Sequence, residues 1–255
     1  MPSDTRAILD RRDLASGNPF LAQRLRPGMA VLDIGCGTGA ITRGIAELVG
    51  FGGETIGLDT NQEFIQRARA SENLPGLSFL VGDAYDLPFE NRFDVVTAAR
   101  VLQWLARPLD ALRSMVKAVK PGRSVVVLDY NHKRIAWDPI PPPKALRFYE
   151  VFLGWRADAG FDNAIADHLV ELFENAGLVD VDAHLADEVS ASGDPGLTLW
   201  ANVAATRGHQ LVADGVLSED ERAAAEAELR AWAEESAKRQ TLYLVSCCGR
   251  RPASE

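Results

Sequence analysis

The chain has 255 residues, of which 47% are hydrophobic and 25% charged, a composition typical of a globular protein with a sizeable core. Its 27 Lys and Arg against 36 Asp and Glu give a formal net charge of −9. This acidity argues against a nucleic-acid partner, because such proteins neutralise phosphates with clustered basic side chains. No apolar run approaches the roughly 18 residues of a membrane-spanning helix, and no apolar signal segment opens the chain. We therefore expect a cytoplasmic protein with no membrane partner.

The three cysteines are Cys36, Cys247 and Cys248. An odd number in a long chain does not indicate a disulfide framework, and none of the spacings suits a zinc site. We expect no metal, and a reducing environment.

Short apolar runs alternate with segments of helical periodicity in the first half of the chain. Strands are predicted at 30–34, 54–59, 77–81, 93–98 and 124–129, and helices at 38–49, after residue 60 and near 109–119. Strands that alternate with helices at this spacing indicate βαβ units, a parallel sheet and helices on both of its faces.

The regular pattern breaks after Tyr130, where residues 131–163 contain several prolines and many aromatic residues. A helix near 165–176 and a strand near 178–185 follow, and then a second irregular stretch at 193–214. The segment 218–221 has the pattern of a capping box that begins an Ala-rich helix, and the last strand is predicted at 240–248. We interpret the chain as one domain, 1–255, with insertions.

A glycine-rich segment at 33–40, Asp-Ile-Gly-Cys-Gly-Thr-Gly-Ala, leaves the first strand and opens a helix. Glycine allows a tight turn and a close approach of the backbone to a ligand. The segment also fits the Gly-x-Gly-x-x-Ala pattern of nicotinamide dinucleotide sites, with Asp59 at a suitable distance for a ribose. By itself, therefore, the segment leaves two kinds of cofactor open.

Two acidic positions favour one of these cofactors. Asp33 places a carboxylate at the mouth of the loop, where it would repel a pyrophosphate but suits the ammonium of a cofactor that carries an amino acid. Asp83 and the backbone N–H of Ala84 follow the third strand, where they can pair with the amino group and ring nitrogen of an adenine.

These residues resemble the class I S-adenosylmethionine-dependent methyltransferases, and most of all the small-molecule branch with the ubiquinone/menaquinone-type enzymes. The matching segments are 31–39, 57–59, 82–84, 87–89, 93–96, 102–105 and 120–123. The resemblance is strong over 28–130 and weak over 164–182. It implies an α/β, Rossmann-like, mostly parallel sheet of seven strands with helices on both faces, an antiparallel last strand and helical insertions that form a substrate lid.

The resemblance also implies S-adenosyl-L-methionine as cofactor. It assigns to the cofactor site Asp33, Gly35, Cys36, Gly37, Gly39, Asp59, Thr60, Asn61, Asp83, Ala84, Arg100 and Gln103. Asp59 is expected on the ribose hydroxyls, Asp33 on the methionyl ammonium, directly or through water, and Arg100 and Gln103 under the methionyl part. Three alternatives stay open: Asp33 caps the turn, Thr60 begins a helix, and Arg100 pairs with an acid.

Candidates for a general base follow the fifth strand: Asp129, Tyr130 and His132. They fall at the carboxyl edge of the parallel strands, where ligands bind in such sheets. A base is dispensable when the acceptor is already deprotonated, and a lone histidine is more often structural than catalytic.

The remaining segments indicate the acceptor. The leading segment 1–27, from Asp4 to Leu25 in particular, and the insertions 131–163 and 193–214, the latter with Trp200, are expected to enclose the substrate beside the core 28–130. Their aromatic content predicts methyl transfer, by in-line displacement, to a small hydrophobic or aromatic acceptor.

Three other functions remain as alternatives: a nicotinamide-dependent oxidoreductase, a non-catalytic cofactor-binding module, and an RNA or protein methyltransferase. No Tyr has a Lys four residues later, which weighs against the oxidoreductase, and 98–101 lacks the Asn/Asp-Pro-Pro motif of enzymes that methylate nucleobase or Gln amines. A homodimer is left open.

Overall fold

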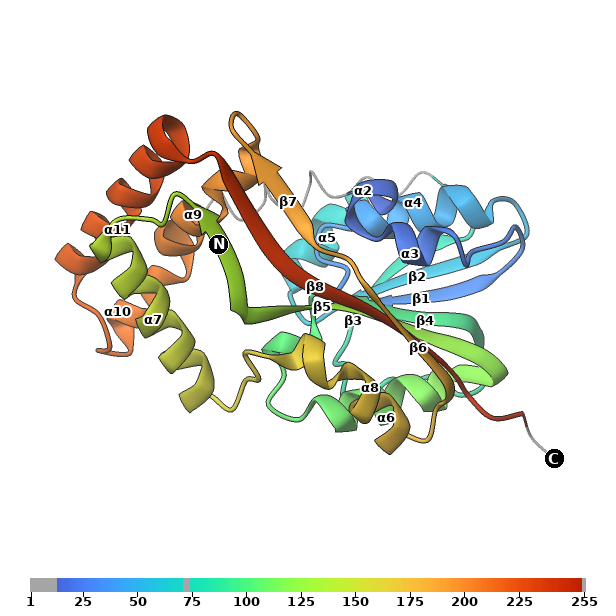
Figure 1. Cartoon of the computed structure of the whole chain (residues 1–255). Coiled ribbons are helices and arrows are strands. Elements are labelled where there is room, and N and C mark those ends of the chain that lie inside the picture. The colour runs from blue at the N-terminus through green and yellow to red at the C-terminus, as the bar shows by residue number, and fades with distance from the viewer. Residues whose placement is uncertain (1–12, 71–73, 254–255) are drawn as a thin grey trace.

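The computed structural model describes residues 13–70 and 74–253. A single sheet runs through it, with strands in the order β3-β2-β1-β4-β5-β8-β6 and a short β7 that also pairs with β8 (Figure 1). The strands are β1 (Ala30–Ile34), β2 (Glu54–Asp59), β3 (Leu77–Val81), β4 (Phe93–Ala99), β5 (Val119–Asp138), β6 (Val179–Leu185), β7 (Glu188–Ala191) and β8 (Arg239–Arg250).

The first five strands pair in parallel, whereas β8 runs antiparallel to its neighbours β5, β6 and β7. The mostly parallel α/β sheet with an antiparallel last strand is therefore confirmed. The sheet of the described residues has eight strands instead of seven, because β6 and β7 pair with successive parts of β8: Leu185 is opposite Val245, and Glu188 is opposite Leu242.

Helices cover both faces of the sheet (Figure 1). On one face lie α2 (Leu14–Gly17), α3 (Pro19–Ala22) and α4 (Ala40–Val49), which share an apolar cluster with β1, β4 and β5. On the other face α6 (Pro108–Ala118) and α8 (Ile165–Asn175) build the largest cluster. The helix α5 (Gln62–Ala70) packs along the β2–β3 end, where Ile65 and Ala68 are buried against Phe79.

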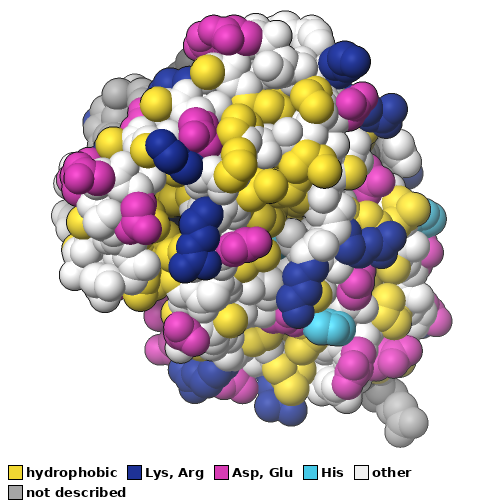
Figure 2. Space-filling view, turned by 60° about the vertical axis from the view of Figure 1, so that its left-hand side comes forward, with side chains coloured by type: hydrophobic (Ala, Val, Ile, Leu, Met, Phe, Trp, Pro, Cys, Tyr) yellow, Lys and Arg dark blue, Asp and Glu magenta, His cyan; other side chains and the backbone are white. Residues whose placement is uncertain are grey.

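A separate group of helices, the helical layer, stands beyond the ends of β5 and β8, at the left in Figure 1. It consists of α7 (Pro143–Asp158), α9 (Leu199–Thr206), α10 (Gly208–Ala213) and α11 (Glu219–Ala231), with short turns η2 (Pro195–Thr198) and η3 (Trp232–Ser236). Phe148, Phe152, Trp200 and Leu229 form its core. The two predicted insertions thus pack together. Figure 2 brings the side of the molecule with the helical layer forward, and hydrophobic side chains gather on the face shown.

Several predicted boundaries differ from the structure, most of them by one or two residues. The strand predicted at 124–129 spans Val119–Asp138: it begins earlier, where Val119 pairs with Phe93, and after an irregularity in its pairing it rejoins β8, with Ala136 opposite Thr241. The helix predicted from residue 38 begins at Ala40, since Gly39 is its N-cap at φ +82°. In the leading segment, residues 4–12 lie outside the described part of the chain, and Leu14–Gly17 and Pro19–Ala22 pack on the core.

The capping box at the start of α11 is confirmed: Ser218 and Glu221 exchange hydrogen bonds between side chain and backbone. In the described ranges, no helix combines the length and the apolar character that crossing a bilayer requires.

Candidate functional site

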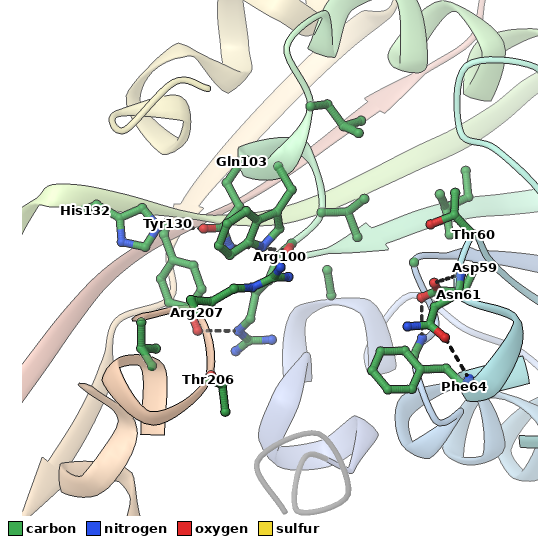
Figure 3. A pocket seen from close by; sticks show the side chains of 18 of the residues that line it. Asp59, Thr60, Asn61, Phe64, Arg100, Gln103, Tyr130, His132, Thr206 and Arg207 are labelled. Carbon is green, nitrogen blue, oxygen red and sulfur yellow. Dashed lines mark hydrogen bonds between the residues drawn. The ribbon is translucent and has the colours of Figure 1, made fainter. Parts of the chain in front are cut away.

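A cavity of about 470 Å³ lies at the carboxyl ends of β1, β2 and β4 and continues to the helical layer (Figure 3). Most of the predicted site residues line it: Gly35, Gly37, Asp59, Thr60, Asn61, Asp83, Ala84, Arg100, Gln103, Tyr130 and His132. Asp33, Cys36, Gly39 and Asp129 do not.

The loop between β1 and α4 depends on glycine for two separate reasons. Gly35 has φ +67° and Gly39 has φ +82°, a region that side-chain-bearing residues rarely adopt. A Cβ on Gly35 would also come within 2.4 Å of Val101 Cγ2, and one on Gly39 within 2.6 Å of the Phe79 ring. The glycine spacing therefore sets both the turn and its packing on β3 and on the turn that follows β4.

Asp59, at the end of β2, is held by two backbone groups. Its Oδ2 accepts a hydrogen bond from the Gly37 N–H at 2.9 Å, and its Oδ1 accepts one from the Asn61 N–H at 2.8 Å. The Asn61 side chain in turn accepts from the Phe64 N–H at 3.2 Å (Figure 3). Because each carboxylate oxygen can accept more than one hydrogen bond, Asp59 keeps acceptor capacity for a pair of hydroxyl groups in the cavity.

The turn after β3 presents an acceptor and a donor. The Asp83 Oδ1 accepts from the Tyr85 N–H at 3.0 Å, which fixes the turn. Ala84 is buried and lines the cavity, and no protein acceptor for its N–H is found in the described ranges. A heteroaromatic ring with an acceptor nitrogen and an amino group matches this pair.

Asp33 and Cys36 support the loop without reaching the cavity. The Asp33 carboxyl is buried and accepts a hydrogen bond from Thr42 Oγ1 at 2.6 Å. Burial raises the pKa of Asp33 to about 7, with the nearby charge of Asp59 adding to the effect and the Thr42 hydrogen bond opposing it. Burial likewise raises the pKa of the Cys36 thiol. Because Asp33 does not line the cavity, of its two predicted contacts with a ligand only the one through water fits this position.

Arg100, just after β4, has φ +63° and a buried side chain. Its Nε donates to the Tyr130 hydroxyl at 2.9 Å, one Nη donates to the Gly17 carbonyl at 3.0 Å, and the guanidinium pairs with Glu188 on β7. The alternative in which Arg100 pairs with an acid is therefore the one found, and the pair ties α2 and β7 to the wall of the cavity.

Gln103, in the short turn η1 (Leu102–Trp104), connects Arg100 to His132. Its Nε2 donates to the Arg100 carbonyl at 3.3 Å, so its Oε1 accepts from His132 Nε2 at 2.5 Å. This assignment places a proton on Nε2, and the buried Nδ1 has no hydrogen-bond partner among the described residues. Burial, with a contribution from the charge of Arg156, holds the pKa of His132 well below its usual range.

Asp129 is fully buried beneath this network. Its Oδ2 accepts from the Gln103 N–H at 3.1 Å and its Oδ1 from the Tyr130 N–H at 2.9 Å. Burial raises the pKa of Asp129 to about 6, against the opposing charges of Arg100 and Arg156. Because it lies outside the cavity, Asp129 positions the η1 turn, and of the three base candidates only Tyr130 and His132 reach the cavity.

Several lining residues were not predicted from the sequence, among them Phe64, Trp104, Ile135, Leu199, Val203, Arg207 and Leu242. Trp104 lies inside a segment used for the family resemblance, and Arg207 inside the second predicted insertion. Their clustering depends on how the helical layer folds back on β4 and β5, which no local pattern shows.

A family model described as "Methyltransferase domain" matches residues 25–147. A ubiquinone/menaquinone biosynthesis C-methyltransferase from Ectopseudomonas mendocina is 41% identical over 112 residues, 42% of this chain and 44% of that protein. A demethylmenaquinone methyltransferase from Lactococcus lactis is 32% identical over 174 residues, 61% of this chain and 68% of that protein. The chain thus spans less than half of the first relative and about two thirds of the second.

Solved structures show the same fold. A putative methyltransferase from Bacillus halodurans has a TM-score of 0.61 at 16% identity, covering 92% of this chain and 99% of that one. The Haemonchus contortus phosphoethanolamine N-methyltransferase 2, in complex with phosphomonomethylethanolamine and S-adenosylhomocysteine, has a TM-score of 0.61 at 17% identity, covering 98% and 58%. The chain belongs to the class I S-adenosylmethionine-dependent methyltransferases, among relatives of the ubiquinone/menaquinone C-methyltransferases.

Proposed function

We propose that this chain transfers a methyl group from S-adenosylmethionine to a small apolar or aromatic acceptor. One observation carries the proposal: a single continuous cavity has the glycine loop and Asp59 at one end and the aromatic side chains of the helical layer at the other. A donor and an acceptor can therefore lie side by side in it.

The residues at the glycine-loop end fit the cofactor. The fixed carboxylate of Asp59 suits the two ribose hydroxyls. Asp83 and the Ala84 N–H, for which the described residues offer no acceptor, suit the edge of an adenine. Gln103, buried against Arg100, would border the methionyl part. When bound, the cofactor supplies a methyl group already activated on a sulfonium, so the chain's own task is to align the acceptor and exclude water.

The acceptor end is apolar. Ile135, Phe152, Trp200 and Val203 line it, and Trp200 is only 4% exposed. A pocket walled by aromatic and aliphatic side chains with a few polar groups is typical of a site for a small, largely hydrophobic molecule. These residues lie in the two insertions, 131–163 and 193–214, which we propose as the substrate-side parts of a single domain.

For acceptors that must lose a proton, we propose His132 as the base. Its ring has an Nδ1 with no hydrogen-bond partner in the part of the chain that the structure describes, whereas the Tyr130 hydroxyl already accepts from Arg100 and donates to Glu188 Oε2 at 3.4 Å. The depressed pKa keeps the ring neutral and able to accept at neutral pH. The cytoplasmic location remains a prediction from the sequence.

Thermal denaturation in the presence of candidate cofactors tests the proposal, since a ligand that binds the native state alone raises the melting temperature. S-adenosylmethionine and S-adenosylhomocysteine should each raise it, and NADP should not. Stabilisation by NADP alone would favour the oxidoreductase alternative and overturn the proposal.

A further inference from the structure

Arg207 lies between α9 and α10 and lines the acceptor end of the cavity. Figure 3 shows its side chain extending from beside Thr206 into the cavity. Its guanidinium carbon lies 4.9 Å from the centre of the Trp104 ring. Within residues 13–70 and 74–253, no hydrogen bond or ion pair to this guanidinium is found.

The other cations near the acceptor end either pair with an acid or lie outside the cavity. Arg100 pairs with Glu188. Arg156 donates to the Gln103 carbonyl at 2.8 Å and to Asn163 Oδ1 at 2.7 Å; its buried Nη1 has no partner among the described residues, but Arg156 does not line the cavity. His132 is neutral. The acids that line the cavity, Asp59 and Asp83, both belong to the glycine-loop end. Among the described residues, therefore, Arg207 brings a positive charge to the acceptor end without a counter-ion.

A half-buried cation with no partner is costly, because burial removes part of its hydration. Here burial lowers the pKa of Arg207, although the group stays charged at neutral pH. A planar guanidinium forms paired hydrogen bonds with an oxyanion, and such a bond would compensate the lost hydration. The rings of Trp104, Phe152 and Trp200 also line the cavity and provide an apolar surface for the rest of a ligand that carries this oxyanion.

We propose that the methyl acceptor carries an anionic oxygen, a carboxylate or an ionised phenol or enol on an apolar or aromatic body, and that this oxygen pairs with Arg207. This inference rests on the proposed function, since it assigns the helical-layer end of the cavity to the acceptor. Arg207 would then select the acceptor, whereas the glycine loop lies at the cofactor end of the cavity.

Calorimetric titration with 1-naphthoate and its neutral counterpart 1-naphthamide tests the pairing, in protein saturated with S-adenosylhomocysteine. The acid should bind at least about 10-fold more tightly than the amide, which is the size expected of one charge-assisted hydrogen bond. Arg207→Gln should abolish this preference, and Arg207→Lys, which keeps the charge without the planar fork, should retain part of it. Arg147→Gln is the matched control, since Arg147 is exposed on α7 and outside the cavity.

4-Nitrophenol, titrated at a pH below and at a pH above its own ionisation, distinguishes the two sources of the oxyanion. Tighter binding of the ionised form supports a phenolate acceptor, and a preference for naphthoate supports a carboxylate. Equal affinities within both comparisons, no binding of any probe, or a preference that survives in Arg207→Gln would overturn the proposal. Because Arg207 makes no hydrogen bond to the described part of the protein and its charge is partly desolvated, Arg207→Gln should not lower the melting temperature of the parent.

A separate titration with S-adenosylhomocysteine alone keeps the two proposals distinguishable. If that ligand binds and the acid preference is absent, only the role of Arg207 fails. If that ligand does not bind, the proposed function fails, and the probe titrations on the unliganded protein still decide whether Arg207 selects an anion.

Discussion

Gly35→Ala should destabilise the protein for two reasons that can be measured separately. Holding a residue with a Cβ at φ +67° costs about 1–2 kcal/mol. The new Cβ would also lie 2.4 Å from Val101 Cγ2, and overpacking of this kind costs about 1–3 kcal/mol. We expect the free energy of unfolding to fall by about 2–5 kcal/mol. Gly28→Ala is the matched control, with φ +84° and nothing within 4 Å of its Cβ, so only the conformational cost should remain.

Urea unfolding of the two variants, of Val101→Ala and of the double variant Gly35→Ala/Val101→Ala provides the assay. Removing the Val101 methyl groups should recover the steric part of the loss, with a coupling energy of about 0.5–3 kcal/mol. If Gly35→Ala costs no more than Gly28→Ala, or if the two changes at the loop are simply additive, the close packing between the loop and Val101 is refuted.

Three further predictions concern separate sites. Asp59→Asn replaces one of two charged acceptor atoms with an amide, so calorimetry should show S-adenosylhomocysteine binding weakened about 10-fold or more, while Asp110→Asn on the exposed face of α6 has no effect. The pKa of Asp33 is raised from 3.8 to about 7, so its contribution to stability is fully present below pH 3.8 and is lost as the pH rises through 7. The difference in unfolding free energy between the parent and Asp33→Asn should therefore decline by up to about 4 kcal/mol over this range, and parallel urea-stability curves would contradict it. Ser218→Ala removes the capping box of α11 and should cost about 1 kcal/mol in urea unfolding, with cofactor affinity unchanged; a loss of affinity would show that the cap also supports the site.

The strands β1, β2 and β3 have the bounds predicted from the sequence, because each is a short apolar run limited by glycine or by polar turn residues. The far end of β5 could not be predicted in the same way. Residues 131–138 are polar, aromatic and irregular in pattern, and they extend the strand only because residues 239–241, more than 100 positions later, pair with them. Strand pairing across such a separation has no local signal.

In the candidate site, too, local sequence predicts some positions, and others depend on packing between distant segments. Asp59 and Gly35, both predicted cofactor-site residues, line the cavity, because turn geometry after parallel strands follows from local sequence. Asp33 was expected at the mouth of the loop, yet the hydrogen bond from Thr42 holds its side chain behind it. Arg207 lies in the insertion 193–214, which was expected to enclose the substrate, but no local pattern distinguished it from the other residues there, since its place beside Trp104 depends on how the insertion folds.

Methyl transfer itself can be measured directly. The protein is incubated with S-adenosylmethionine bearing a deuterated methyl group and with a panel of aromatic carboxylic acids and phenols, and the products are followed by mass spectrometry. We expect a labelled acceptor, with one S-adenosylhomocysteine formed for each product, and about 10-fold less of both when Asp59→Asn replaces the parent at low cofactor concentration. The proposed methyl transfer would be contradicted if no member of the panel were labelled and S-adenosylhomocysteine did not stabilise the protein.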